Sequence, residues 1–380
     1  MSEAPSTPFT PMTIAHANFH MLWGGQAEVV FSLSKSLSQR GHKVTIVCPP
    51  GSELEKRGSE AGLRVFTGCS FRKGLRPIAF ARDVSRLRAF FRKENVQIYH
   101  CHGSQDHWIG ALAASHSTRI VRTRHNIYQV RNHPFNRWLF RHKTAQVITI
   151  FSEQERYFTE NGLLHASQLV MLPSPLPEEF VNPAHVTRVL RHELNLSDQI
   201  PLVGFVANSF HPDKAPLDFI AAAERVAKAL PQVHFCMVGH GPLEEEMRAK
   251  IKLAGLDARF HLPGFRKDIL HVVASFELLA LTSVAREASS TVLKQVAAAG
   301  VPVVATDVGG TREVVDDGIT GTIVKPGDIE SLANAMLALL NNPARAAAMG
   351  AAGKEKVLRE FTAKAIAERT EAVYRRLLEH

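Results

Sequence analysis

The 380-residue chain lacks long apolar runs, and none reaches the roughly 18 residues that a membrane-spanning helix needs. Its first residues, MSEAPSTPFTP, lack the basic start and apolar core of a secretory leader, so a cytoplasmic location is expected. Cysteine is scarce, and the four cysteines are scattered without a CxxC pair: Cys48, Cys69, Cys101 and Cys236. This pattern argues against a disulfide framework and fits a reducing compartment.

Three kinds of ligand lack their usual sequence patterns. Gly24 and Gly25 precede a predicted helix but do not form GxGxxG, which disfavours a nicotinamide dinucleotide. The tripeptide His100-Cys101-His102 has no second cluster at zinc spacing, and neighbouring strand residues point to opposite faces, so no metal is expected. Basic residues are not interleaved with aromatic ones and no helix-turn-helix pattern occurs, so nucleic acid is not an expected partner.

Positive charge is concentrated in the first half of a chain whose net charge is +9. Residues 64–143 contain 16 Lys and Arg against 3 Asp and Glu. Within them, residues 76–96 place Ile78, Val84, Leu87 and Phe91 at helical spacing, surrounded by five basic residues: Arg82, Arg86, Arg88, Arg92 and Lys93. Either this is the solvated side of an amphipathic helix, or it contacts anionic lipid headgroups at the inner face of the cytoplasmic membrane.

Strand and helix patterns alternate along the chain, which predicts parallel sheets covered by helices on both faces. Strands are expected at 12–17, 43–49, 97–101, 119–124 and 146–151, and again at 201–207, 233–239, 276–283 and 301–307. Residues 172–200 contain four prolines and no strand candidate. We therefore expect an α/β protein with two Rossmann-like, doubly wound domains facing a cleft. The expected boundaries are 1–175, a linker at 176–200, 201–355, and a C-terminal helix at 356–380 that packs back towards the first domain.

One carboxylate, Glu287, lies between a strand expected to end at Ser283 and a helix expected to begin near Ser289. A helix that starts where a strand ends offers free N–H groups to an anion. Glu287 therefore either stabilises its own helix end or lies beside a bound phosphate. In the second case the phosphate takes the amides of Ser289, Ser290 and Thr291, and Glu287 binds the neighbouring hydroxyl groups.

The segment SVAREASSTVLKQVAAAGVPVVATDVGGTREVVDDGITGTIVKPGD resembles the signature block of the retaining glycosyltransferases of family four, also called group 1, which have the GT-B fold. Ser283, Glu287, Gly300 and Pro302 match the family pattern, and Gln295 replaces its second Glu. Six further segments resemble family motifs in the family's order: GGQAEVVFSLSKSLSQRGHKVTIV, IYHCHGS, RTRHN, VGFVANSFHPDKAPLDFIAAA, MVGHGPLEEEM and HLPGFRKDI. Together they cover most of the chain.

The resemblance implies transfer of a sugar from a nucleotide diphosphate donor with retention at the anomeric carbon, usually without a metal or other cofactor. A UDP-hexose is the default donor, and an envelope glycan or lipid-linked precursor of lipopolysaccharide or exopolysaccharide is the expected acceptor. By family position the catalytic residues are Glu287, His125 and Lys214. Donor contacts are expected from Gly24, Gly25, Asn208, Gly239, Gly241, Phe265, Arg266, Ser289, Ser290, Thr291 and Gln295. The basic helix containing Arg82, Arg86, Arg88, Arg92 and Lys93 is expected to face the acceptor or the membrane.

Two departures from the family pattern leave alternatives open. Asn208 stands at or near a position that is usually Arg, for which Arg286 or Lys294 is the expected substitute, and Gln295 is neutral where the family has an acid. One alternative is therefore a catalytically impaired protein of the same fold that binds a nucleotide sugar or a partner. The other is a nucleotide-sugar 2-epimerase.

Overall fold

The computed structural model describes residues 10–72, 76–125, 127–183 and 185–379, which divide into two compact units. Unit 1 comprises the chain up to Ile150, residues Gln154–Pro175, and the C-terminal segment from Ala363. Unit 2 comprises Phe151–Glu153 and Leu176–Thr362. After the short segment Phe151–Glu153, the chain enters unit 2 again at Leu176, where the sequence pattern suggested a linker, and returns to unit 1 at Ala363 instead of residue 356.

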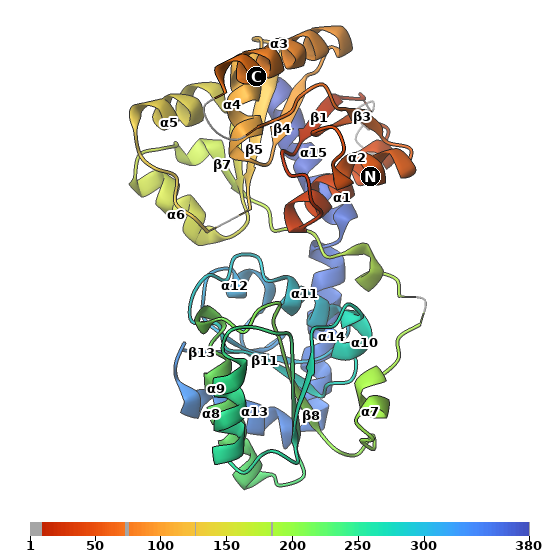
Figure 1. The fold of residues 1–380 in the computed structure, drawn as a ribbon, viewed down its shortest axis with the longest axis vertical. Coiled ribbons are helices and arrows are strands. Elements are labelled where there is room, and N and C mark those ends of the chain that lie inside the picture. Colours follow the sequence, from red (N-terminus) through yellow and green to blue (C-terminus); the bar gives the residue numbers. More distant parts are fainter. Residues whose placement is uncertain (1–9, 73–75, 126, 184, 380) are drawn as a thin grey trace, which may run out of the picture. The chain divides into compact units, whose positions relative to one another are not determined.

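Unit 1 is built on a seven-stranded parallel sheet with the order β3-β2-β1-β4-β5-β6-β7 (Figure 1). Its strands are β1 (Thr13–Ala17), β2 (Lys43–Val47), β3 (Arg64–Phe66), β4 (Ile98–Cys101), β5 (Arg119–Arg124), β6 (Gln146–Thr149) and β7 (Leu169–Met171). Its helices are α1 (Gly25–Gln39), α2 (Glu53–Glu60), α3 (Pro77–Glu94), α4 (Ser104–Ala113), α5 (Pro134–Trp138), the π-helical turn η1 (Leu139–Lys143), α6 (Ser152–Glu160), the 3-10 turn η2 (Ala166–Gln168) and α15 (Ala363–Glu379).

The C-terminal helix α15 completes the core of unit 1. It packs against α1, and its apolar face joins the cluster that contains Ile14, Leu37 and Ile98. Tyr374 is fully buried, and its hydroxyl lies 2.9 Å from His16 Nε2 and 2.6 Å from His100 Nδ1. A residue from the far end of the chain therefore fixes two imidazoles at the centre of the sheet.

Unit 2 is built on a six-stranded parallel sheet with the order β10-β9-β8-β11-β12-β13. Its strands are β8 (Leu202–Val206), β9 (His234–Val238), β10 (Phe260–Gly264), β11 (Leu278–Leu281), β12 (Val303–Thr306) and β13 (Thr322–Val324). Its helices are α7 (Val189–Glu193), α8 (Pro216–Ala229), α9 (Glu244–Leu253), α10 (Ile269–Val273), α11 (Thr291–Ala298), α12 (Thr311–Val314), α13 (Ile329–Leu340) and α14 (Pro343–Glu360), with 3-10 turns η3 (Glu178–Phe180) and η4 (Pro212–Lys214). The prediction of two doubly wound α/β domains is confirmed.

Strand order locates a crevice in each sheet. The chain reverses direction across the sheet between β1 and β4 in unit 1, and between β8 and β11 in unit 2. In doubly wound sheets the loops after two such strands diverge and leave a binding crevice at their carboxyl ends. In unit 2 these loops contain Lys214 and Glu287.

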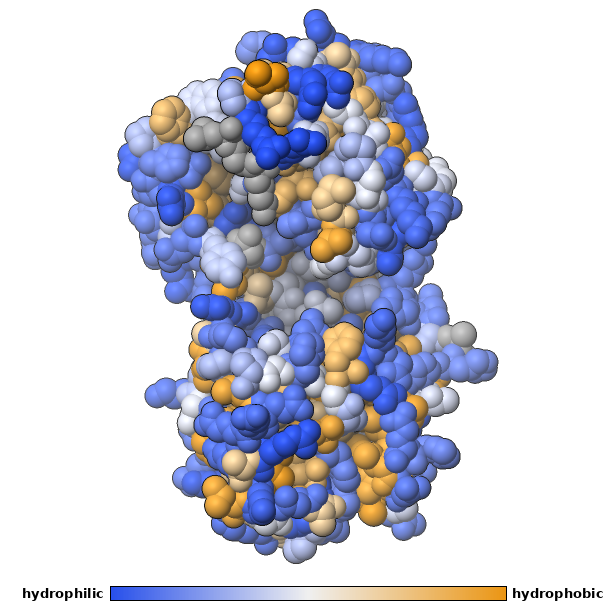
Figure 2. Space-filling view, in the orientation of Figure 1, coloured by the Kyte–Doolittle hydropathy of each residue, from blue (hydrophilic) through white to orange (hydrophobic). Residues whose placement is uncertain are grey.

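Helix α3 differs from its predicted packing at one end. Leu87 and Phe91 are buried as the helical spacing predicts, but Ile78 in the first turn is 84% exposed. The five basic residues of α3 are exposed, and the surface around this helix in Figure 2 is mostly hydrophilic with small hydrophobic patches. Among the described residues, no helix is long and apolar enough to span a bilayer.

Candidate functional site

The crevice of unit 2 brings Lys214 and Glu287 together. Lys214 ends the turn η4 after β8, and Glu287 lies in the loop between β11 and α11. The Lys214 Nζ donates to Glu287 Oε2 at 2.5 Å, and the Ser283 hydroxyl donates to the same oxygen at 2.8 Å. Glu287 is only 6% exposed, so this pairing offsets the cost of burying its charge.

Two glycines hold the backbone of the Glu287 loop. Gly309 has φ of 52°, and a Cβ atom there would lie 1.7 Å from the carbonyl oxygen of Glu287. A Cβ atom on Gly310 would lie 2.0 Å from the carbonyl oxygen of Ala288, and the Gly310 amide donates to the Glu287 carbonyl at 3.0 Å. Only glycine permits this close approach. Sequence analysis did not select these residues, although a Gly-Gly pair shortly after a strand was the available signal.

A second contact joins the same two loops. Arg286 adopts a left-handed φ of 56°, and its Nη1 lies 3.2 Å from the Asp213 carboxylate. The amide of Val284 donates to the Asp213 carbonyl at 2.9 Å. Arg286, expected as a substitute cation for a phosphate, is thus 55% exposed in its side chain and paired with an acid in the β8 loop.

Helix α11 begins at Thr291, two positions later than predicted, because Ser290 is its N-cap. The Ser290 hydroxyl accepts from the Leu293 amide at 3.4 Å. Gln295 is partly buried on the same helix. Lys294, the other expected substitute cation, is fully buried; its Nζ donates to the Ser289 hydroxyl at 3.0 Å, and burial lowers its pKa to about 7. Its place below the helix surface argues against direct phosphate contact.

Of the residues expected to surround the nucleotide, the glycines pack against backbone, whereas Phe265 and Asn208 are exposed. Gly239 and Gly241 lie against the backbone of the β8 loop, where a Cβ atom would approach Ala207 O to 1.9 Å and Phe210 N to 2.4 Å. Phe265 is 52% exposed, with its ring edge-on to His240 at 5.7 Å, and Asn208 is exposed.

Arg266, a predicted donor contact, forms ion pairs inside unit 2. Its guanidinium lies 2.7 Å from Glu193 and 2.6 Å from Asp268. Two carboxylates therefore already use its donors, so a donor contact would require competition with them.

In unit 1, His125 directly follows β5 and is partly buried. Its Nε2 lies 2.7 Å from His102 Nδ1, and the two rings are stacked at 5.0 Å. Burial, followed by the charges of Arg122 and Arg124, lowers the pKa of His125 to about 3. The ring is therefore neutral near pH 7, and it acts as a hydrogen-bonding group instead of a cation.

The loop before α1 contains the other predicted residues of unit 1. Gly24 has φ of −176° and is the N-cap of α1, and a Cβ atom on Gly24 or Gly25 would meet nothing within 4 Å. Neither glycine has a positive φ, so no unusual backbone conformation requires them. What these glycines leave is open space at a helix start.

Two family models match the chain in succession. Residues 23–179 match "Glycosyltransferase Family 4", and residues 200–342 match "Glycosyl transferases group 1". A putative glycosyltransferase EpsD of Bacillus subtilis is 24% identical over 298 residues, which are 74% of this chain and 77% of that protein.

Solved structures share the fold along almost the whole chain. A glycosyltransferase from Rickettsia africae aligns with a TM-score of 0.83 and 18% identity, covering 98% of this chain and 100% of that one. Anabaena Alr3699/HepE, solved in complex with UDP, aligns with a TM-score of 0.79 and 19% identity, covering 96% and 100%.

Proposed function

The chain belongs to the group 1, family 4 glycosyltransferases, and from this premise we propose that it transfers a hexose from a UDP-sugar with retention at the anomeric carbon. The proposed acceptor is a cell-envelope glycan or a lipid-linked precursor of lipopolysaccharide or exopolysaccharide, met in the cytoplasm or at the inner face of its membrane. The UDP complex of the similar Anabaena protein supports the choice of nucleotide. The exposed basic face of α3 supports an anionic or membrane-bound acceptor.

The observation that carries this proposal is the pairing of Lys214 with a buried Glu287 at the β8–β11 crevice. When the glycosidic bond to the diphosphate breaks, negative charge grows on the leaving group, and preorganised donors stabilise it. We assign this role to the Lys214 ammonium and the first amides of α11. No step of the proposed reaction requires a cofactor.

The sugar hydroxyls need acceptors and donors of their own. Glu287 is assigned to them. Lys214 and Ser283 both contact its Oε2 atom, and its other oxygen, Oε1, is assigned to the sugar hydroxyls. Gln295 is assigned to the ribose, where its amide accepts and donates. His125 is assigned to positioning the transferred sugar as a neutral ring.

The experiment is a panel of UDP-, GDP- and ADP-sugars, each incubated with envelope-glycan and lipid-linked acceptors that receive the sugar, with release of nucleoside diphosphate as the readout. We expect turnover with a UDP-hexose, and Glu287→Gln to lower kcat/KM about 10- to 100-fold, the equivalent of one charged hydrogen bond. Glu355→Gln is the matched control, because that carboxylate is 78% exposed on α14.

The outcomes separate the three hypotheses. Turnover lost in Glu287→Gln and kept in Glu355→Gln supports the transferase. UDP-sugar binding without turnover favours the binding protein, and a C2 epimer formed without acceptor favours the epimerase.

A further inference from the structure

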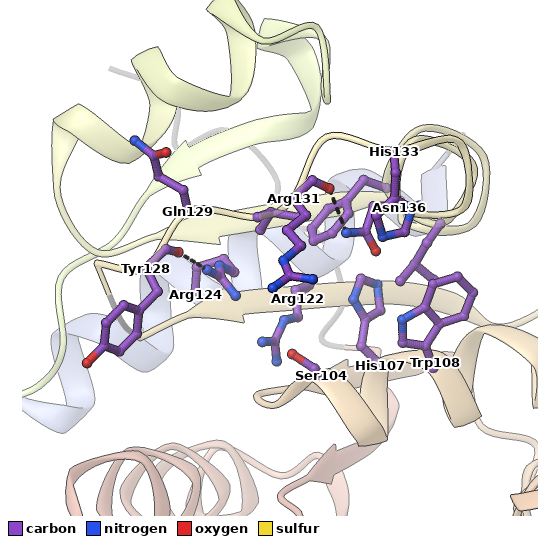
Figure 3. Close-up of a pocket in the computed structure, with 13 residues that line it drawn as sticks. Ser104, His107, Trp108, Arg122, Arg124, Tyr128, Gln129, Arg131, His133 and Asn136 are labelled. Atoms are coloured by element: carbon purple, nitrogen blue, oxygen red, sulfur yellow. Dashed lines mark hydrogen bonds between the residues drawn. The ribbon is translucent and has the colours of Figure 1, made fainter. Parts of the chain in front are cut away.

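A pocket of about 310 Å³ lies in unit 1, on the face of β5 opposite to the one used by Thr123 and His125. Its walls are α4, the end of β5, the segment that follows it, and α5 with its π-helical continuation. Figure 3 shows the side chains of His107 and Trp108 entering from α4, and those of Arg122, Arg124 and Arg131 from β5 and its loop. None of these five residues belongs to the site proposed above.

The charged groups that line this pocket are all basic. Three are arginines, and the described lining residues include no Asp or Glu. Arg122 is 3% exposed, and its Nε and Nη1 are buried without a hydrogen-bond partner. A guanidinium remains charged and has five N–H donors, so two orphaned donors on a buried one are rare in a folded protein.

The surrounding protein does not supply the missing anion. Asp106 is the acidic residue that interacts electrostatically with Arg122. Its carboxylate, however, accepts hydrogen bonds from the amides of His102 and Gly103, each at 2.9 Å. No N···O distance of 4.0 Å or less joins it to Arg122, both residues being described. Arg124 adds a like charge and donates to the Tyr128 carbonyl at 2.5 Å. Among the described residues, Arg122 therefore contacts no carboxylate, and its side chain lies against the neutral Cys101 thiol.

The two histidines of the pocket, His107 and His133, form their hydrogen bonds with other residues and not with Arg122. His107 Nε2 lies 2.8 Å from the Thr144 hydroxyl, which itself donates to the Leu139 carbonyl at 2.9 Å. His107 is therefore the donor in that contact. Burial and the nearby Arg122 and Arg124 lower its pKa well below the usual value, so the ring is neutral. His133 caps α5 by accepting from the Asn136 amide at 3.3 Å.

We propose that this pocket binds a phosphate group, and that the phosphate belongs to the acceptor of the sugar transfer; the second part rests on the proposed function. Guanidinium groups recognise phosphate oxygens through paired, charge-assisted hydrogen bonds. Arg131 and Tyr128 are exposed at the rim, which leaves the pocket open to a group larger than the phosphate itself. Arg124 immediately precedes His125, so the pocket lies at the same end of β5 as the residue assigned to the sugar, on the opposite face of the strand.

The test is calorimetric titration of the full chain at constant ionic strength with inorganic phosphate, glycerol 3-phosphate and glycerol. Saturating UDP is added so that the proposed diphosphate site of unit 2 is occupied. We expect glycerol 3-phosphate to bind one per chain at least as tightly as inorganic phosphate, and glycerol not to bind. Arg122→Gln should raise the Kd about tenfold or more, as expected for the loss of charged hydrogen bonds.

Two further variants keep this test decisive if Arg122→Gln folds poorly. Arg131→Gln changes an exposed rim residue and should weaken binding severalfold. Arg137→Gln removes the same charge from α5 outside the pocket, where Arg137 donates to Asn132 at 2.7 Å, and should leave the Kd within about twofold. Equal weakening by Arg131→Gln and Arg137→Gln, or no phosphate binding to the wild type, overturns the site.

A third result concerns the source of the phosphate. Inorganic phosphate that binds while glycerol 3-phosphate is excluded overturns the acceptor assignment. Failure of the proposed function appears differently, as absence of UDP binding or sugar turnover. The weaker phosphate binding of Arg131→Gln relative to Arg137→Gln reports on the pocket of unit 1 and requires neither UDP binding nor turnover, so the two failures are distinguishable.

Discussion

Replacing Lys294 by methionine should stabilise unit 2 at neutral pH, although it removes a hydrogen bond. The lysine is fully buried in α11, and burial lowers its pKa from 10.5 to about 7. Each pKa unit corresponds to about 1.4 kcal/mol, so this shift amounts to about 5 kcal/mol of unfavourable free energy. Each hydrogen bond that the ammonium loses, the one to the Ser289 hydroxyl among them, offsets about 1 kcal/mol of that. We expect a net gain of several kcal/mol in the free energy of unfolding.

The pH dependence gives the sign. Above pH 10.5 Lys294 is neutral in both states and costs nothing. Between pH 10.5 and 7 the unfolded chain binds a proton that the folded chain does not, so stability falls as the pH falls. Below about pH 7 both states are charged and the full cost remains. The wild type should therefore gain about 1 kcal/mol between pH 7.5 and 8.5 from this group, and Lys294→Met should lack that gain.

Urea unfolding at these two pH values measures the effect. All three tryptophans, Trp23, Trp108 and Trp138, lie in unit 1, so fluorescence follows unit 1 and circular dichroism reports unit 2 in addition. Lys228→Met is the control, because that side chain is 72% exposed. A Lys294→Met protein less stable than wild type at pH 7.5, with an unchanged pH slope, would refute the reasoning.

Three other variants or conditions test the fold around the two sites. Gly309→Ala should abolish UDP-sugar turnover and lower the free energy of unfolding of unit 2 by about 2 kcal/mol or more, because the added Cβ meets the Glu287 carbonyl. Gly255→Ala is the control, because Gly255 also has a positive φ but faces open space. It should lower the free energy of unfolding by about 1 to 2 kcal/mol and leave turnover intact. Acidification should unfold unit 1, because burial lowers the pKa of His16 to about 4 and of His125 to about 3. The stability present above pH 6.5 is lost as the pH falls towards these values. Tryptophan fluorescence measures the transition, and His16→Gln should shift it to lower pH. Arg40→Met should lower the free energy of unfolding of unit 1 by about 1 kcal/mol at pH 7, because Arg40 donates to Glu371 on α15 at 2.6 Å. The pKa of Glu371 is lowered to about 2. The difference between wild type and variant, measured by urea unfolding, should therefore shrink as the pH falls from 4.5 to 2.

The central strands could be predicted from the sequence because a parallel strand buried on both faces is a continuous apolar run. The edge strands β3, β7, β10 and β13 were not predicted. β8, β9, β11 and β12 all lie within their predicted segments. The same reasoning failed at Ile78, where the helical spacing is correct but the side chain, in the first turn of α3, is exposed while Leu87 and Phe91 are buried. Helical periodicity shows which face of a helix a side chain lies on, but it does not show whether another element covers that face along its whole length.

The site was predictable only where local order in the sequence determines it. Glu287 and Lys214 lie far apart in the chain, and the family pattern selected both, whereas their contact depends on β8 and β11 being neighbours. The arginines of β5 show the opposite case. Arg122 and Arg124 alternate with apolar or small residues, a pattern that normally marks a solvated strand face. In the structure α4 and α5 cover that face, as the alternation of strands and helices predicts, but the pattern does not indicate that they leave a pocket over these two arginines.

The surroundings of Glu287 decide between its two interpretations from sequence. A carboxylate that stabilises its own helix end would accept from the first-turn amides of α11, but Ser290 caps the Leu293 amide instead. The charge of Glu287 is directed to Lys214 and Ser283, which follow two strands at the sheet's point of reversal. A buried ion pair of this kind adds little net stability, since burial of both groups offsets their attraction. Helix capping therefore does not account for this acid, and its contact with an ammonium supports the role proposed for it beside Lys214.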